Sequence, residues 1–243
     1  MPYEIKEREE HRLTEYDETE DECRNNIEKN PKDADAHRDL GDMLVKSKSY
    51  HEAKKEYEKA IEINPEDAQA HKSLGDLLFT SERYNEAKLA YKKAIKLKDK
   101  LPDKGAAAHN NMGNLLTKLE EYRLSEKEYR NALEINPKYA EARYNLAYLL
   151  ERLTRYREAE EELRKAIEIN PELAQAHNNL GDILFTMKRY PEAEEELRKA
   201  IEINPEIAHA HYNLGTLLKE LKRNEESENE FGIAYKLFEK ARK

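Results

Sequence analysis

One short motif, a large apolar residue followed by Gly or Ala, returns along the whole chain at a nearly constant interval. It begins at residues 40, 74, 112, 146, 180 and 214, so the steps are 34, 38, 34, 34 and 34 residues. Prolines keep the same spacing, at positions 31, 65, 137, 171 and 205. A fixed period of this size indicates a chain built from copies of one supersecondary unit, which stack to share a core.

Six repeats account for most of the chain. They cover 34–67, 68–101, 106–139, 140–173, 174–207 and 208–241, and residues 102–105 fall outside the period. Each repeat carries two apolar patterns with helical spacing, separated by a short polar break. The repeats therefore predict pairs of antiparallel helices, named A and B, at 34–47 and 50–63 in repeat one and at equivalent positions elsewhere.

An Asn-Pro pair follows helix B in most repeats, as at Asn64-Pro65. Asparagine tolerates the left-handed conformation that often follows a helix, and proline cannot continue one. We therefore expect helix B to end at this pair. We interpret residues 102–105 as a neutral insertion that lengthens helix B of repeat two by one turn, since a turn takes 3.6 residues.

Small and large side chains keep fixed places within the repeat. Position 8 is Gly in five repeats and Ala147 in the other, although Gly costs about 1 kcal/mol inside a helix. Position 20 is Ala or Ser and position 27 is always Ala, whereas position 24 is Tyr, Leu or Phe. We interpret position 8 as the place where helix A approaches helix B closely.

This pattern resembles the tetratricopeptide repeat. The resemblance rests on a large residue at position 7, Gly or Ala at 8, Leu at 11, Ala at 20, an aromatic at 24, Ala at 27 and Pro at 32, over residues 34–241. It implies an all-α fold, a right-handed superhelical α-solenoid of tandem antiparallel helix pairs with the A helices along a concave groove. It also implies a non-catalytic scaffold or adaptor that binds an extended peptide or a partner protein in that groove.

Composition excludes several classes of protein. The net charge of −9 disfavours binding to nucleic acid. The sequence has no run of about 18 apolar residues that could span a membrane, and its N-terminus does not read as a secretory signal. Cys23 is the only cysteine, so no disulfide framework and no cysteine-based metal site is expected. We expect a cytoplasmic protein with neither nucleic acid nor membrane as a partner.

No motif for catalysis or cofactor binding occurs in the sequence, so we expect no enzyme, no cofactor and no metal site. Histidines do recur at position 4. Packed helices lie about 10 Å apart, whereas zinc needs nitrogens about 2.0–2.1 Å away, so these histidines cannot share an ion. We interpret them as packing residues between helices. They are His37, His71, His109, His177 and His211.

The side of helix A opposite the packed stripe is the candidate peptide-binding surface. Its position 6 carries four consecutive asparagines, Asn111, Asn145, Asn179 and Asn213. An amide both donates and accepts, so such a ladder can hold a peptide backbone. It resembles the asparagine ladder of one member of the family, O-linked N-acetylglucosamine transferase. Because Asn is common at this position throughout the family, packing consensus is the alternative.

Further candidate peptide-binding residues surround the ladder. They are Phe79, Tyr144, Tyr148, Asp182, Phe185 and Tyr212. Aromatic side chains on a hydrophilic surface suit an interface. Asp182 and Phe185 repeat Asp76 and Phe79 at positions where packing does not require it. Inherited duplication and packing by neighbouring repeats remain alternatives to ligand contact.

A groove for chaperone C-terminal tails would need two basic residues that this chain lacks. The five positions of that two-carboxylate clamp read Lys72, Asp76, Asn111, Glu141 and Asn145. Two match, and two acidic replacements would repel a carboxylate. We exclude this class of partner.

The two ends differ from the central repeats. Residues 1–33 hold 12 acidic and 6 basic residues, and we interpret them as a degenerate acidic capping unit, with Tyr16 at a helix B position. An acidic interaction tail is the alternative. Near the C-terminus, Phe231, Ala234, Tyr235 and Phe238 form an apolar stripe. End-to-end self-assembly, with a homo-oligomer formed through this helix, is therefore the alternative function.

Overall fold

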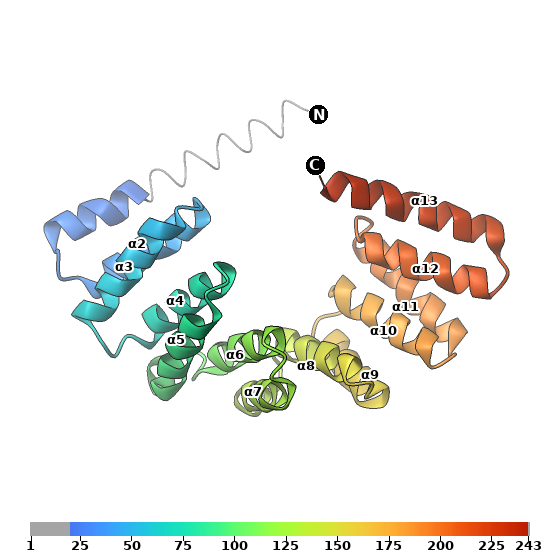
Figure 1. The fold of residues 1–243 in the computed structure, drawn as a ribbon, viewed down its shortest axis with the longest axis horizontal. Coiled ribbons are helices and arrows are strands. Elements are labelled where there is room, and N and C mark those ends of the chain that lie inside the picture. The colour runs from blue at the N-terminus through green and yellow to red at the C-terminus, as the bar shows by residue number, and fades with distance from the viewer. Residues whose placement is uncertain (1–19, 243) are drawn as a thin grey trace. The chain divides into compact units, whose positions relative to one another are not determined.

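The computed structural model describes residues 20–242, which contain no strand. Residues 20–29 are helical. The helices that follow (Figure 1) are α2 Ala34–Lys46, α3 Tyr50–Ile63, α4 Ala68–Thr80, α5 Tyr84–Lys96, the 3₁₀ helix η1 Lys98–Lys100, α6 Ala106–Lys118, α7 Tyr122–Ile135, α8 Ala140–Arg152, α9 Tyr156–Ile169, α10 Ala174–Thr186, α11 Tyr190–Ile203, α12 Ala208–Glu220 and α13 Asn224–Ala241. The predicted all-α class and the tandem helix pairs are confirmed.

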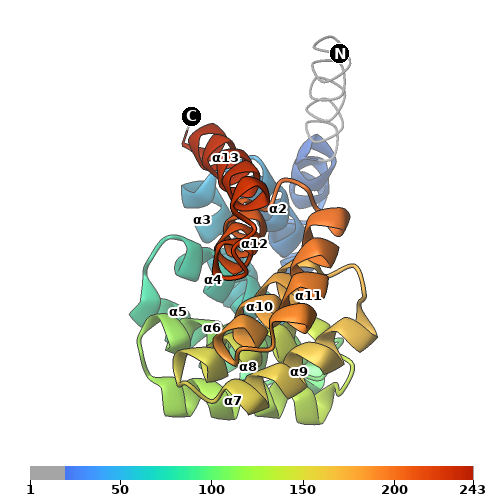
Figure 2. The ribbon, with the colours of Figure 1, turned by 90° about the vertical axis from the view of Figure 1, so that its right-hand side faces the viewer.

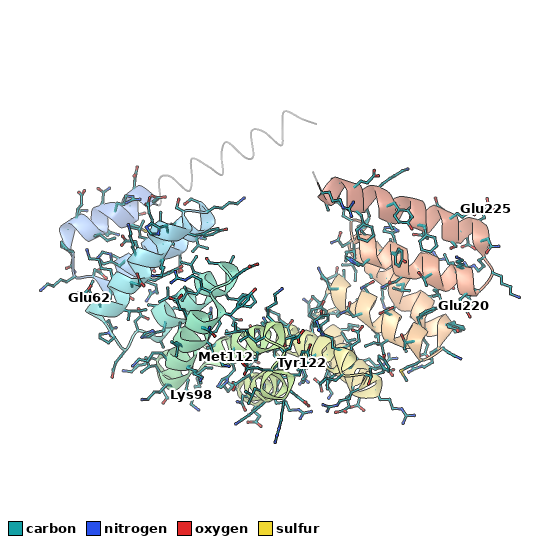
Figure 3. The ribbon with its side chains drawn as sticks, viewed as in Figure 1. Glu62, Lys98, Met112, Tyr122, Glu220 and Glu225 are labelled. Carbon is teal, nitrogen blue, oxygen red and sulfur yellow. The ribbon has the colours of Figure 1, made fainter. Side chains whose placement is uncertain are left out.

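The chain forms two compact units, Met1–Glu121 and Tyr122–Lys243, here called the N-terminal and C-terminal units. Within each unit an A helix packs on its own B helix and on the preceding one, as α10 does on α11 and α9. Consecutive A helices also touch, α2 with α4, α4 with α6, α8 with α10 and α10 with α12. Figure 2 shows α12 and α13 side by side, and Figure 3 places Glu220 and Glu225 at one end of this antiparallel pair.

Helix A ends in the same turn in every repeat. Position 15 has a φ between 58° and 63° in Lys48, Glu82, Glu120, Thr154, Lys188 and Lys222. In repeat one, the N–H of Ser49 donates to the carbonyl of Leu44 at 2.8 Å, and that of Lys48 donates to Val45 at 3.1 Å. These two bonds form a Schellman motif. Because none of the six residues is Gly, the sequence does not reveal this left-handed position.

The expectation of a left-handed Asn after helix B is wrong. Asn64, Asn170 and Asn204 are extended, with φ of −127°, −134° and −139°. The Oδ1 atom of Asn64 instead accepts a hydrogen bond from the N–H of Glu66, at 3.2 Å. The asparagine side chain therefore stabilises the turn that contains the proline. Helix B does end at this pair.

Residues 102–105 do not lengthen helix B of repeat two, contrary to expectation. Helix α5 stops at Lys96, and η1 and a turn follow. Leu101 is buried in a small apolar cluster, and Gly105 precedes α6 with a φ of 93°. The carboxylate of Asp103 accepts a hydrogen bond from the N–H of Gly105 at 2.9 Å. The buried side chain of Leu101 and the turn at Gly105 thus determine the conformation of this segment. A longer helix B would lose both.

The helix at 20–29 packs on repeat one. Cys23 and Ile27 are partly buried against a cluster that includes Leu40 and Leu44. This contact supports a capping role for residues 1–33, which stays a prediction. Tyr16 lies outside the described residues.

Most of the C-terminal apolar stripe packs on α12. The ring of Phe231 lies 5.4 Å from that of Tyr212, and the ring of Phe238 lies 5.1 Å from that of His209. Tyr235 remains exposed. Little of the stripe is therefore free, and association through α13 stays a prediction.

Position 8 lies at the close contact between helices A and B, as predicted. A methyl group at Gly75 would lie 2.6 Å from Cε1 of Tyr91, and one at Gly181 would lie 2.6 Å from Cγ of Leu197. Tyr91 and Leu197 occupy position 24 and are fully buried. The side chain at position 24 therefore fills the space that a larger residue at position 8 would need.

We predict that Gly75→Ala lowers the free energy of unfolding by about 1–3 kcal/mol, because the added methyl group overlaps a rigid, buried ring. Gly232→Ala is the matched control, since no atom lies within 4 Å of an added methyl group there. That change should raise stability by up to about 1 kcal/mol, the difference in helix propensity. Urea denaturation measures both variants, and a Gly75 variant as stable as the wild type would contradict the contact.

Candidate functional site

Positions 2, 5, 6, 9, 12 and 13 of the A helices form the surface that we call the A face. In the C-terminal unit it is built by α8, α10 and α12. Two predicted peptide-binding residues contribute mainly to packing. The ring of Phe79 lies 5.9 Å from that of Tyr84, and the ring of Phe185 lies 5.7 Å from that of Tyr190. Both phenylalanines are partly buried against the core, so packing explains why they recur.

Three predicted tyrosines lie on the A face of the C-terminal unit. Tyr148 and Tyr212 are each 42% exposed. Tyr144 is partly buried, and its hydroxyl oxygen lies 3.4 Å from Nδ2 of Asn179. Half-exposed aromatic rings are typical of protein interfaces, so this face retains the character of a binding surface.

The predicted asparagine ladder is partly engaged inside the protein. Three amides donate to the preceding A helix, Asn111 to Asp76 at 2.7 Å, Asn179 to Tyr144 at 3.4 Å and Asn213 to Asn178 at 3.1 Å. Asn145 is not free either. The carbonyl oxygen of Asn213 accepts no hydrogen bond from another described residue. The asparagine side chains therefore link consecutive A helices. The carbonyl oxygen of Asn213 can still accept a hydrogen bond from a ligand.

In the N-terminal unit, the polar groups of the A face satisfy one another. Asp42 accepts from Tyr57 at 2.6 Å, and Asp76 accepts from Tyr91 at 2.8 Å and from Asn111, and pairs with Lys72 at 3.0 Å. A hollow of about 380 Å³ lies between α2 and α4 and includes both carboxylates. This hollow was not predicted from the sequence, because it depends on how two neighbouring repeats fit together.

Asp182 occupies in repeat five the place that Asp76 occupies in repeat two, but it has none of the same partners. Leu197 replaces the tyrosine of position 24, and Asn178 replaces the lysine of position 5. The amide of Asn213 donates to Asn178 instead. Asp182 therefore has no hydrogen-bonding or ion-pair partner among the side chains of residues 20–242.

A second carboxylate, Glu151 on α8, lies beside Asp182. Burial, together with the negative charge of Asp182, raises the pKa of Glu151 to about 7, and burial also raises the pKa of Asp182. No described cation pairs with Glu151. The sequence analysis missed this residue, although a carboxylate at position 12, where Phe79 and Phe185 stand in other repeats, was a visible signal.

The histidines of position 4 lie between helices, as predicted. In His37, His177 and His211, Nδ1 lies 2.6 Å from a glutamate of helix B, and Nε2 lies 3.0–3.3 Å from a proline carbonyl. Arg143 makes the same two kinds of contact. The contact with glutamate joins helix A to helix B of the same repeat.

Residues 20–242 bring together no group of three or more His, Cys, Asp or Glu side chains that could hold a metal ion. None of the described helices combines the length and apolar character that crossing a membrane requires.

Family models match the repeats over most of the chain. Models described as tetratricopeptide repeat match residues 106–172, 140–206, 172–240 and 68–101, and one described as TPR repeat matches 41–81. The chain belongs to the tetratricopeptide repeat family. The resemblance seen in the sequence is thus confirmed.

Solved structures of other tetratricopeptide repeat proteins share the fold. YrrB, reported as a TPR protein with an unusual peptide-binding site, is 27% identical, with a TM-score of 0.59, over 77% of this chain and 95% of YrrB. PilF of Pseudomonas aeruginosa is 20% identical, with a TM-score of 0.73, over 87% and 90% of the two chains. MamA is 23% identical, with a TM-score of 0.60, over 72% and 94%. No curated protein matches the sequence.

The thermal stability of Glu151→Gln at different pH values tests the raised pKa of this carboxyl group. Because its pKa in the folded protein is about 7, above the ordinary value near 4.5, ionisation of Glu151 disfavours the folded state. The wild type should therefore lose stability relative to the variant as the pH rises from about 4.5 to above 7. We expect similar thermal midpoints at pH 4.5 and a higher midpoint for the variant at pH 8.

The control for this pH dependence is Glu161→Gln, which alters an exposed residue of α9. Its midpoint should differ from the wild type by the same amount at both pH values. A Glu151 variant whose difference is equally constant would contradict the environment described for this carboxyl group.

Proposed function

We propose that this protein is an interaction scaffold whose C-terminal unit binds an extended peptide across its A face, and that the peptide carries a basic side chain. Members of the tetratricopeptide repeat family are typically non-catalytic scaffolds for protein or peptide partners. The report of a peptide-binding site in YrrB supports the choice of a peptide.

The contrast between Asp76 and Asp182 carries the proposal. The carboxylate at this position has three side-chain partners in Asp76 and none among the described side chains in Asp182, beside which Glu151 lies. Removing a carboxylate from water without a partner is unfavourable, and a guanidinium or ammonium group of a ligand would supply charge-assisted hydrogen bonds. The exposed rings of Tyr148 and Tyr212 offer apolar contact area on the same face.

Helix spacing limits the length of peptide that the face can bind. Helices α8, α10 and α12 are separated by two steps of about 10 Å each. An extended chain rises about 3.3 Å per residue, so about six residues cross the face. The free carbonyl oxygen of Asn213 can accept a backbone N–H at one end of this path.

Fluorescence anisotropy with six-residue peptides tests this proposal. One set carries a central Arg, and the other carries citrulline, which has a similar shape without the charge. The double variant Asp182→Asn/Glu151→Gln should bind the Arg peptides at least tenfold more weakly, because bonds to charged groups contribute about 1.5–3 kcal/mol. Binding of the Arg peptides should also weaken with added salt.

The matched control is Glu161→Gln/Glu195→Gln, which removes the same number of charges from exposed residues of α9 and α11. It should leave the affinity within about twofold of the wild type, since these glutamates are not on the A face. Equal affinity for Arg and citrulline peptides would reject the basic ligand, and full binding by Tyr148→Ala/Asn213→Ala would reject the face itself.

A further inference from the structure

A second hollow lies in the N-terminal unit, on the side formed by the B helices of repeats one and two. It measures about 360 Å³, and its lining includes Ile61 of α3, His71 and Leu74 of α4, and Leu89, Ala90 and Lys93 of α5. Leu89 is 68% exposed, the largest value among the exposed large hydrophobic residues of the described chain. Together with Ile61, Leu74 and Ala90, it gives the hollow an apolar lining.

Repeat two lacks a carboxylate that the other repeats have. Position 23 of helix B is glutamate in Glu56, Glu128, Glu162, Glu196 and Glu230, but it is Ala90 in repeat two. In repeats one, four, five and six this carboxylate lies 2.6 Å from the His or Arg of position 4. The hollow thus lies where a carboxylate is bound elsewhere in the same molecule.

Without this glutamate, neither His71 nor Lys93 has a carboxylate partner among the described residues. Nε2 of His71 bonds to the carbonyl of Pro65 at 3.1 Å, but its Nδ1 forms no hydrogen bond or ion pair with a described residue. The other position 4 histidines are at most 8% exposed, whereas His71 is only half-buried. Lys93 forms no ion pair with a described residue, although its equivalent Lys165 bonds to Glu162 at 2.8 Å.

The junction between repeats one and two is also unusual in charge. Elsewhere a residue of position 21 pairs with position 16 of the next repeat, as in Lys88–Glu121, Glu126–Arg155, Glu160–Arg189 and Glu194–Arg223. At this junction the two residues are Lys54 and Arg83, which carry the same charge and bond within their own helices. Lys54 pairs with Glu58 and Arg83 pairs with Glu86, so this junction lacks the ion pair that joins neighbouring repeats elsewhere.

We propose that this hollow binds an acidic side chain of a partner protein, presented next to an apolar side chain. The carboxylate would take the place of the missing glutamate, between Nδ1 of His71 and the ammonium group of Lys93. The apolar neighbour would cover Leu89. This site lies on the B-helix side of the N-terminal unit and does not depend on the proposed A-face function.

Protonation of His71 couples this binding to pH. Since Nε2–H donates to a carbonyl, Nδ1 can donate to a carboxylate only when the ring is charged. Burial and the charge of Lys93 lower the pKa of His71 below its ordinary value of 6.5, while the bond to Pro65 and the charge of Asp67 oppose this shift. Lys54 and Glu58 of α3 and Glu86 of α5 are the other charged groups of the hollow.

A bound carboxylate would raise the pKa of His71, so binding takes up a proton. Affinity should therefore increase as the pH falls from the pKa of the complex to that of the free protein, by at most tenfold per pH unit. Below the pKa of the free protein it should become constant, provided that the ligand stays ionised.

A displayed library of random 12-residue peptides, selected on the wild type and counter-selected on Ala90→Glu, tests this proposal. Enriched peptides should share Asp or Glu next to an apolar residue. Calorimetry at pH 5.5 and 7.5 should show tighter binding at the lower pH. Replacing the acidic residue of the peptide by its amide should weaken binding at least tenfold and remove the pH dependence.

Variants of the protein distinguish a blocked binding site from a loss of folding. Ala90→Glu should weaken peptide binding at least tenfold, because the new glutamate occupies the place of the ligand's carboxylate. It should also raise the thermal midpoint, because the glutamate makes the contact with position 4 that four other repeats show. Lys93→Gln should weaken binding several-fold, whereas Lys92→Gln, which changes an exposed neighbour, should not. Asp182→Asn/Glu151→Gln should bind these peptides normally.

Four results would overturn the proposal. They are a library that yields no acidic consensus, a lower thermal midpoint for Ala90→Glu, unchanged peptide binding by that variant, and wild-type self-association in sedimentation that Ala90→Glu abolishes. The last result would assign the hollow to a second copy of the chain.

Discussion

The close contact between helices A and B is the interaction on which the rest of the structure depends. A small residue at position 8 lets the large side chain of position 24 pack into the angle between the helices, as Tyr91 does against Gly75. Other repeated features lie on the two helices that this contact joins. The His–Glu contact spans the same two helices, and the A face is the side of helix A that points away from helix B.

Because all repeats share this packing, differences between them identify residues that packing does not require. Asp76 and Asp182 occupy one position, yet only Asp76 has hydrogen-bonding partners. His37 and His71 likewise occupy one position, yet only His37 has a carboxylate within reach. In both cases the missing partner reflects a different residue at another position of the repeat. Leu197 and Asn178 stand where Asp76 has Tyr91 and Lys72, and Ala90 stands where His37 has Glu56. The repeats thus serve as internal controls for one another.

The two sites present different kinds of polar group. Asp182 and Glu151 are neighbouring carboxylates on the A face of the C-terminal unit, whereas His71 and Lys93 in the hollow of the N-terminal unit lack the carboxylate that position 23 supplies elsewhere. The ligands proposed for the two sites therefore carry opposite charges. Electrostatic complementarity of this sort contributes more to partner choice and association rate than to total affinity.

The sequence by itself determined the helices, their pairing and the small residue at position 8, because these follow from local periodicity and from the volume of single side chains. It also located Tyr148, Tyr212 and Asp182 on one surface. Only the tertiary structure decided that Phe79 and Phe185 pack against helix B, and that the asparagines bond to the preceding A helix. The hydrogen bonds of these amides join residues 35 positions apart, and the His–Glu pairs span 19. Whether a polar group is satisfied depends on such distant neighbours, so a pattern read along one repeat cannot show it.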